Sequence, residues 1–273
     1  MMGEQSGWQL SGRGPEAYER YIAQPFLTPC APDLIEAAAV TAGDRVLDIA
    51  CGTGAVARSA ARRVGATGQV VGMDLNTGML DFARLRVQQD PEAAIEWRPS
   101  DVAALDAPDT SFDVVLCQQG MQFFPDKAAA LREMFRVLVP GGRVAFSVLR
   151  AIHYNPYQQA VADALARHVG PNVATVIHTP FALDDATTLR HLTTTAGFRD
   201  VHIQIAIKVC RHPSLQELVP GYLAATPAAD TVAALDDSVQ AAIVQDVQAA
   251  LQAYMDDDGL AVPLDFHVVT AQK

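Results

Sequence analysis

The chain has 273 residues, of which 50% are hydrophobic and 19% charged, so it is long enough to bury a full α/β core and does not have the composition of a disordered protein. A formal net charge of −11 disfavours nucleic acids and anionic membranes as partners, because binding a polyphosphate surface needs clustered Lys and Arg. The sequence therefore predicts one globular domain over residues 1–273, with no nucleic acid and no membrane among its partners.

The cysteine spacing and the lengths of the apolar runs argue against further classes of protein. Cys30, Cys51, Cys117 and Cys210 are widely spaced, with no C-x-x-C pair, which argues against a disulfide framework and against a zinc site. No apolar run approaches the roughly 20 residues of a membrane-spanning helix, and no basic segment leads into an apolar N-terminal stretch. We expect a soluble, cytoplasmic protein without a metal centre.

The first elements along the chain form an N-terminal segment and a strand–helix core. Residues 1–14 are polar and Gly-rich, and a helix is expected over residues 15–21, so residues 1–30 are interpreted as a lid that brings Tyr21 over a bound cofactor. Residues 31–150 alternate strand and helix patterns with short connections, which predicts a doubly wound parallel α/β sheet. The expected strands cover residues 45–50, 69–74, 94–98, 113–118 and 142–149, with one helix over residues 55–64 and another that ends at Pro140-Gly141-Gly142.

The remaining third of the chain predicts helices and two further strands. Helices are expected over residues 157–169 and 184–196, and strands over residues 201–209 and 264–270. Residues 211–258 separate those two strands and contain a strongly periodic helix through Val239 and Leu251. An insertion of this length usually forms a lid or a partner surface.

The most informative segment is Val46-Leu47-Asp48-Ile49-Ala50-Cys51-Gly52-Thr53-Gly54, a short buried strand that leads into a glycine turn. Gly52 and Gly54 permit a sharp bend and a close approach of the backbone to a ligand, and the N–H groups of the following helix face the same space. Asp74 ends the next buried strand, twenty residues after Gly54, and suits the two hydroxyls of a ribose. The pattern predicts a nucleoside-containing cofactor.

The glycine spacing alone leaves the cofactor open. Gly52-x-Gly54-x-x-Ala57 with Asp74 also satisfies the fingerprint of NAD enzymes, so an NAD-dependent oxidoreductase is an alternative. Asp48 disfavours it, because a buried carboxylate there repels a pyrophosphate but suits the amino group of an amino-acid-like ligand. Asp101 follows the third strand and is interpreted either as the partner of an adenine amino group or as a turn residue.

Five ordered motifs resemble those of class I S-adenosylmethionine-dependent methyltransferases, and most closely the small-molecule branch that includes ubiquinone and menaquinone biosynthesis methyltransferases. The motifs are Asp48 to Gly54, Asp74, Ser100-Asp101-Val102, Phe112 to Asp126 and Leu138 to Arg143. The resemblance implies a seven-stranded Rossmann-like sheet with an antiparallel last strand, S-adenosylmethionine as cofactor and S-adenosylhomocysteine as product. Its implied cofactor site, with the residues argued above, comprises Tyr21, Asp48, Ala50, Cys51, Gly52, Thr53, Gly54, Asp74, Leu75, Met79, Asp101, Val102, Cys117 and Gln118.

The expected reaction is methyl transfer to a small organic acceptor through an O, N or C nucleophile. Alignment of the acceptor with the methyl group is the main requirement, and a base is optional. His153 with Tyr154 is the candidate pair for such a base, and Gln122 stands where relatives often carry a His. Leu218, Tyr222 and Leu223 of the insertion are interpreted as acceptor-pocket or core residues. A catalytically idle cofactor-binding module with a protein partner, and a homo-oligomer, stay open.

Overall fold

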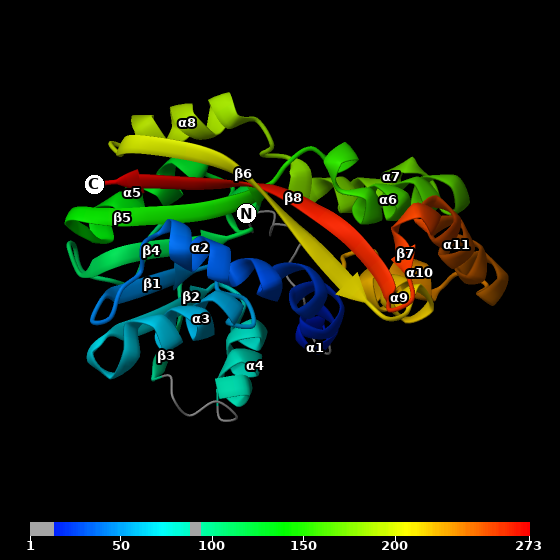
Figure 1. Ribbon diagram of the computed structural model, residues 1–273, viewed down its shortest axis with the longest axis horizontal. Helices are drawn as coiled ribbons and strands as arrows, with labels where there is room; N and C mark the ends of the chain where they lie inside the picture. The colour runs from blue at the N-terminus through cyan, green and yellow to red at the C-terminus, as the bar shows by residue number, and fades with distance from the viewer. Residues whose placement is uncertain (1–13, 88–93) are drawn as a thin grey trace, which may run out of the picture.

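The computed structural model describes residues 14–87 and 94–273, so residues 1–13 of the polar stretch expected over residues 1–14 lie outside the described residues. Figure 1 shows a twisted sheet flanked by helices, with a second group of helices beside one end of the strands. The strands are β1 (Arg45–Ile49), β2 (Gln69–Asp74), β3 (Ile95–Pro99), β4 (Phe112–Gln118), β5 (Leu138–Leu149), β6 (Arg199–His212), β7 (Met255–Asp256) and β8 (Gly259–Gln272).

The sheet has the expected doubly wound topology. Its strand order is β3-β2-β1-β4-β5-β8-β6, with β7 paired to β8 off this path. The neighbours from β3 to β5 are parallel, whereas β8 runs antiparallel to both β5 and β6. This arrangement confirms the predicted seven-stranded sheet with an antiparallel last strand, and β7 adds a two-residue strand beside it.

Helices cover both faces of the sheet. One hydrophobic cluster includes residues of α2 (Ala31–Ala37) and α3 (Ala55–Val64), and a second includes residues of α5 (Lys127–Val137) and α8 (Ala186–Thr195). Helix α4 (Thr77–Val87) follows β2, and α3 has the bounds that its sequence predicts. Short 3-10 turns lie at Gly65–Thr67, Met121–Phe123, Ile152–Tyr154, Thr179–Phe181 and Gln252–Tyr254.

The predicted limits of α5, β5, β6 and β8 are wrong. Helix α5 ends at Val137, and Pro140-Gly141-Gly142 lies inside β5, where the pairing with β4 jumps from Leu138 to Arg143. The three residues form an irregularity in the strand rather than a helix stop, since Gly141 supplies a left-handed φ of 78°. Strands β6 and β8 are longer than expected, because they continue beyond the end of β5 and pair with each other there.

The extended ends of β6 and β8 carry the second group of helices. This group contains α6 (Pro156–His168), α7 (Pro171–His178), α9 (Leu215–Ala224), α10 (Ala229–Ala233) and α11 (Asp237–Ala250). Figure 1 places it beside the carboxyl ends of the parallel strands. Its buried residues belong to the same hydrophobic cluster as α2 and α3, so the two parts share one core.

The described N-terminal segment lies between the sheet and this helical group (Figure 1). It begins with α1 (Gly14–Tyr18), continues as a π-helix over Glu19–Leu27 and ends in a 3-10 turn at Thr28–Cys30. Glu19 is 4% exposed, and its Oε1 lies 3.9 Å from Arg58 and 3.5 Å from Arg86. Arg20 forms an ion pair with Glu217 of α9. The segment is thus held to α3, α4 and α9 by charged groups.

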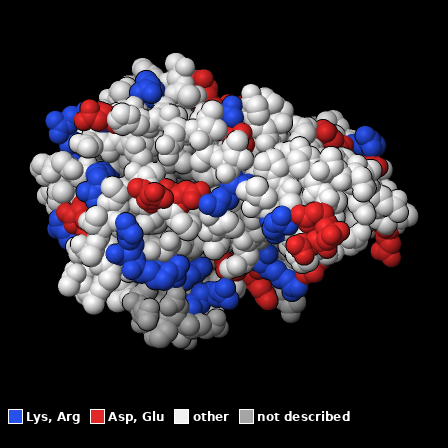
Figure 2. All heavy atoms as spheres, viewed as in Figure 1, with Lys and Arg blue, Asp and Glu red and all other residues white. Residues whose placement is uncertain are grey.

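Charged side chains of both signs are interspersed over the face drawn in Figure 2, with a basic group over α3 and α4. This group includes Arg62 and Arg63 at the end of α3 and Arg84 and Arg86 at the end of α4. The surface is therefore locally basic at this place, although the net charge of the chain is negative. In the described ranges, no helix combines the length and the apolar character that crossing a bilayer requires.

Candidate functional site

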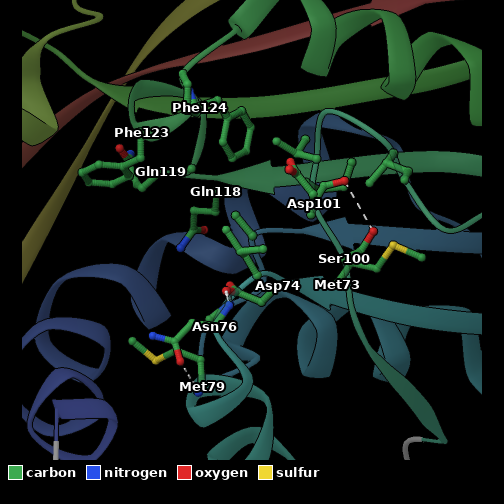
Figure 3. Close-up of a pocket in the computed structure, with 18 of the residues that line it drawn as sticks. Met73, Asp74, Asn76, Met79, Ser100, Asp101, Gln118, Gln119, Phe123 and Phe124 are labelled. Carbon is green, nitrogen blue, oxygen red and sulfur yellow. Dashed lines mark hydrogen bonds between the residues drawn. The ribbon is translucent and has the colours of Figure 1, made fainter. Parts of the chain in front are cut away.

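The largest of three neighbouring cavities lies at the carboxyl ends of β1, β2, β3 and β4, and we call it the strand-end pocket. It contains about 1050 Å³ of empty space up to and including its open mouth. Figure 3 shows Asp74 and Asn76 on one side, Ser100 and Asp101 on another, and Gln118 opposite them. In an open α/β sheet this edge, near the point where strand order reverses, is where ligands bind.

Asp74 is held by the backbone at the centre of this pocket. Its Oδ2 accepts a hydrogen bond from the N–H of Gly52 at 2.8 Å, and its Oδ1 accepts one from the N–H of Asn76 at 2.8 Å. Burial raises the pKa of the carboxyl, and the backbone N–H groups oppose that effect. The carboxylate is thereby fixed in orientation, with lone pairs left for hydroxyl donors of a ligand.

The wall beyond β2 and β3 combines apolar side chains with a second carboxylate. Leu75 is 57% exposed and Met79 is 6% exposed, and both line the strand-end pocket together with Val102. Asp101 also lines it, while its Oδ1 accepts a hydrogen bond from the N–H of Ala103 at 2.9 Å. The two interpretations of Asp101 are thus compatible, because one carboxylate oxygen stabilises the turn and the residue still borders the pocket.

Two non-glycine residues with left-handed backbone border the pocket at the ends of adjacent strands. Ala50 follows β1 with φ 54°, and Gln119 follows β4 with φ 54°. A Cβ on Gly120 would lie 2.8 Å from the Cβ of Ala50, so the two turns are in close contact. Strained backbone held by tight packing is typical of functional sites, and here it forms the pocket floor.

A smaller cavity under the glycine turn, the turn pocket, is lined by a buried acid. Asp48 is 1% exposed and lines this pocket with Cys51, Thr53 and Gln118. Within the described chain, Asp48 Oδ2 has no hydrogen-bond partner, and burial raises the pKa of the carboxyl well above its usual range. A buried carboxylate with a free oxygen suits a cationic group such as an ammonium.

The third cavity, the aromatic pocket, adjoins the strand-end pocket and shares Tyr18, Gln119 and Phe123 with it. Its walls come from the N-terminal segment, the turn after β4, α6, the 3-10 turn at Thr179–Phe181 and α9. The rings of Phe26 and Tyr222 meet edge to face, with centroids 6.2 Å apart. An apolar cavity next to a polar one provides room for two ligands side by side.

Three of the predicted cofactor-site residues do not line any of these three pockets. Tyr21 donates a hydrogen bond to Glu217 on α9, and Gly54 lies under Trp97, whose ring would be 2.4 Å from an added Cβ. Cys117 is fully buried beside Gly120. Gly54 and Cys117 thus lie against packed side chains, whereas Tyr18, just before the π-helix that contains Tyr21, lines all three pockets.

The candidate bases also lie apart from the pockets. His153 and Tyr154 are exposed, stack on each other with centroids 4.0 Å apart, and border none of the three pockets. The guanidinium of Arg150 lies 4.0 Å from the Tyr154 ring centroid. Gln122, in contrast, is 6% exposed and lines the aromatic pocket. His153 lies four residues after the end of β5, in the 3-10 turn at Ile152–Tyr154, and its side chain is exposed there.

The sequence places Tyr18 with Tyr21 in the segment expected to cover the cofactor, and Tyr18 lines all three pockets. Asn76 and Phe124, which line the strand-end pocket, were not among the expected cofactor-site residues. Phe123 and Phe124 belong to the motif from Phe112 to Asp126, so their position in that motif was the available signal.

The family comparison is consistent with this geometry. Residues 32–209 match the model of the ubiE/COQ5 methyltransferase family. The chain belongs to this family. Among its members, the ubiquinone/menaquinone biosynthesis C-methyltransferase UbiE of Proteus mirabilis is 35% identical over 160 residues, which are 58% of this chain and 61% of that protein. The demethylmenaquinone methyltransferase of Lactobacillus johnsonii is 32% identical over 175 residues, covering 60% of this chain and 71% of its own. The chain thus matches less than two thirds of the first of these ubiE/COQ5 relatives.

Solved structures agree on the fold. The phosphoethanolamine N-methyltransferase 2 of Haemonchus contortus, in complex with phosphomonomethylethanolamine and S-adenosylhomocysteine, aligns with a TM-score of 0.60 at 21% identity, over 95% of this chain and 57% of that one. The YcgJ protein of Bacillus subtilis aligns with a TM-score of 0.59 at 16% identity, over 89% of this chain and 97% of that one. At these identities the likeness establishes the Rossmann-like architecture of this ubiE/COQ5 family member and not its substrate.

Proposed function

We propose that the protein transfers a methyl group from S-adenosylmethionine to a small organic acceptor and releases S-adenosylhomocysteine. The observation that carries this proposal is the joining of two unlike cavities by Tyr18, Gln119 and Phe123. One cavity is bordered by the carboxylates at the strand ends, and the other is apolar and aromatic. A donor and an acceptor held side by side in this way are in the geometry that group transfer requires.

The residues fit S-adenosylmethionine. Asp74 would hold the ribose hydroxyls, and Asp101 with Val102 would border the adenine. The free Oδ2 of Asp48 in the turn pocket suits the ammonium of the methionine part, and this buried acid disfavours the pyrophosphate of NAD. Leu75, with 57% of its surface exposed, would be covered by the nucleoside.

The chain's own contribution is binding, orientation and exclusion of water. The bound cofactor supplies a methyl group on a sulfonium, which is already a strong electrophile. Correct alignment of two bound reactants is worth roughly 7 to 11 kcal/mol, so a protein base is not required for a large acceleration. The described residues that line the aromatic pocket include no Asp, Glu, Lys, Arg or His, which supports a mechanism by proximity.

The names of the curated relatives make a quinone-type ring a candidate acceptor and carbon a candidate methylation site. The apolar walls of the aromatic pocket are compatible with such a ring. One of the solved structures with the same architecture, at 19% identity and a TM-score of 0.54, is a [4+2]-cyclase, so the fold by itself does not fix the reaction.

Isothermal titration calorimetry with S-adenosylhomocysteine and NAD separates the proposed reaction from its main alternative. We expect binding of S-adenosylhomocysteine and none of NAD, followed by transfer of a labelled methyl group to an acceptor from a panel of phenols, hydroquinones and amines. Tight binding of NAD without binding of S-adenosylhomocysteine would overturn the proposal. Binding without transfer to any acceptor, together with stable association with one protein, would instead identify an idle binding module.

A further inference from the structure

The aromatic pocket is uncharged but contains three buried side-chain amides. Gln119, Gln122 and Gln158 are 9%, 6% and 4% exposed and line this pocket among aromatic and aliphatic side chains. A buried amide is costly unless its donor and acceptor atoms are satisfied. The amide atoms that have no hydrogen-bond partner within the chain therefore indicate which hydrogen-bonding groups a ligand of this pocket carries.

The orientation of the Gln122 amide is fixed by the backbone. Its Nε2 donates to the carbonyl oxygen of Gln119 at 2.9 Å, and only the nitrogen end of the amide can donate to a carbonyl. The Oε1 end is consequently the end that faces away from this bond. Gln122 Oε1 is fully buried and has no hydrogen-bond partner within the described residues, so this strong acceptor, on a residue that lines the aromatic pocket, lacks the hydrogen bond that would offset its burial.

Gln158, on α6, provides a second open acceptor. Its Oε1 is also buried without a partner within the described residues, and the residue also lines the aromatic pocket. Two amides from separate elements, the turn after β4 and α6, thus border the same cavity.

The described lining of the aromatic pocket disfavours an ionic ligand. None of its described lining residues is an Asp, Glu, Lys, Arg or His. Burial raises the pKa of the two tyrosines that border the cavity, Tyr18 and Tyr222, so both stay neutral at physiological pH. A carboxylate, phosphate or ammonium would lose its hydration there without gaining a counter-charge.

We propose that Gln122 is a specificity residue for the methyl acceptor: its free Oε1 accepts a hydrogen bond from an O–H or N–H of an uncharged, mainly apolar acceptor molecule bound in the aromatic pocket. Because an amide does not take up a proton at physiological pH, Gln122 selects and orients the acceptor but does not deprotonate it. This inference rests on the proposed function, since it assigns the aromatic pocket to the acceptor side of that reaction.

Three naphthalenes of similar size test the inference on the wild-type protein. 2-Naphthol carries one O–H donor, 2-methoxynaphthalene carries none, and 2-naphthoate is an anion. Calorimetry with saturating S-adenosylhomocysteine should give the tightest binding for 2-naphthol and about tenfold weaker binding for 2-methoxynaphthalene, because the latter leaves the buried carbonyl unsatisfied. 2-Naphthoate should not bind measurably. Equal affinities for the first two probes, or binding of 2-naphthoate, would overturn the inference.

A substitution then assigns the discrimination to Gln122. Gln122→Met keeps the length of the side chain and removes its carbonyl, so 2-naphthol and 2-methoxynaphthalene should bind with affinities within about twofold of each other. Gln245→Met, on the exposed side of α11, is the matched control and should retain the wild-type preference. A preference that survives in Gln122→Met, in a variant shown to be folded by circular dichroism, would assign the discrimination elsewhere and refute the role of Gln122.

The two proposals fail in different ways. If S-adenosylhomocysteine does not bind, the proposed methyl transfer fails, while the naphthalene series can still be measured without it. If S-adenosylhomocysteine binds and the naphthalene preference is missing, methyl transfer stands and the assignment of Gln122 is wrong.

Discussion

The carboxylate of Asp74 accepts the backbone N–H of Gly52 at 2.8 Å, which links the end of β2 to the glycine turn after β1. Gly52 has φ 53° and presents its open side to the ring of Tyr18, 3.8 Å from where a Cβ would be. One hydrogen bond therefore connects the two adjacent strand ends and orients the turn on which the N-terminal segment rests. The residue expected to hold the ribose thus also stabilises the local backbone.

Replacing Asp74 tests the ribose assignment. Asp74→Ala removes a charged hydrogen-bond acceptor and should weaken binding of S-adenosylhomocysteine by about 1.5 to 3 kcal/mol, measured by calorimetry. Asp81→Ala, in an exposed i,i+3 ion pair with Arg84 on α4, is the control and should leave the affinity unchanged. Equal affinity in Asp74→Ala and the wild type would remove Asp74 from the cofactor site.

Replacing Asp48 by Asn should raise the free energy of unfolding and lower the affinity for S-adenosylhomocysteine. Burial raises the pKa of its carboxyl in the folded chain, so the folded state holds this proton more tightly than the unfolded state. Its contribution to the free energy of unfolding is complete below the unfolded pKa and is lost as the pH rises through the folded pKa. Asp48→Asn removes that loss, and it should raise the free energy of unfolding at pH 8 by about 1 to 3 kcal/mol.

Urea unfolding at pH 5 and pH 8 measures this effect. The difference between Asp48→Asn and the wild type should be larger at pH 8, whereas the affinity of the variant for S-adenosylhomocysteine should fall because the ammonium loses its counter-charge. Asp81→Asn provides a matched surface control. A variant less stable than the wild type at pH 8 would contradict a net cost of burying this carboxylate.

The central sheet was predictable because its signals are local. The buried strand before Cys51, the glycine turn and helix α3 follow one another directly, and an acid at the end of β2 comes next to that turn by parallel pairing alone. The same locality explains why Asp48, Asp74 and Asp101 could be named from the sequence.

Tyr222 and Gln122 were named from the sequence, but their assembly into the aromatic pocket was not predictable in this way, because its walls come from segments far apart in the chain. Phe26, Phe181 and Tyr222 converge only after β6 and β8 extend past the sheet and carry α9 back toward the N-terminal segment. Tyr21 lies in a π-helix that begins directly after Tyr18. An α-helical period read from the sequence therefore does not give the relative directions of the two side chains. The free carbonyl of Gln122 depends on a backbone contact within a 3-10 turn, which residue type does not reveal.

His153 and Tyr154 should be dispensable. Their exposed stack beside Arg150 lies outside the three pockets, so His153→Ala and Tyr154→Ala should each change the rate of methyl transfer by no more than about twofold, as surface substitutions do. Single-turnover transfer of labelled methyl to the acceptor found in the panel measures this. A tenfold loss in either variant, at unchanged affinity for S-adenosylhomocysteine, would restore a role for the pair in the reaction.

The contact between Tyr21 and Gly221 should fix the N-terminal segment against α9. A Cβ on Gly221 would lie 2.4 Å from Cγ of the Tyr21 ring, so Gly221→Ala should lower the free energy of unfolding by about 1 to 3 kcal/mol, although the same exchange in an unobstructed helix is stabilising. In a Tyr21→Ala background the obstruction is absent, and Gly221→Ala should become neutral or stabilising. Urea denaturation of the two single variants and the double variant gives the coupling energy directly. Additive effects of the two substitutions would show that the N-terminal segment is not held at this point.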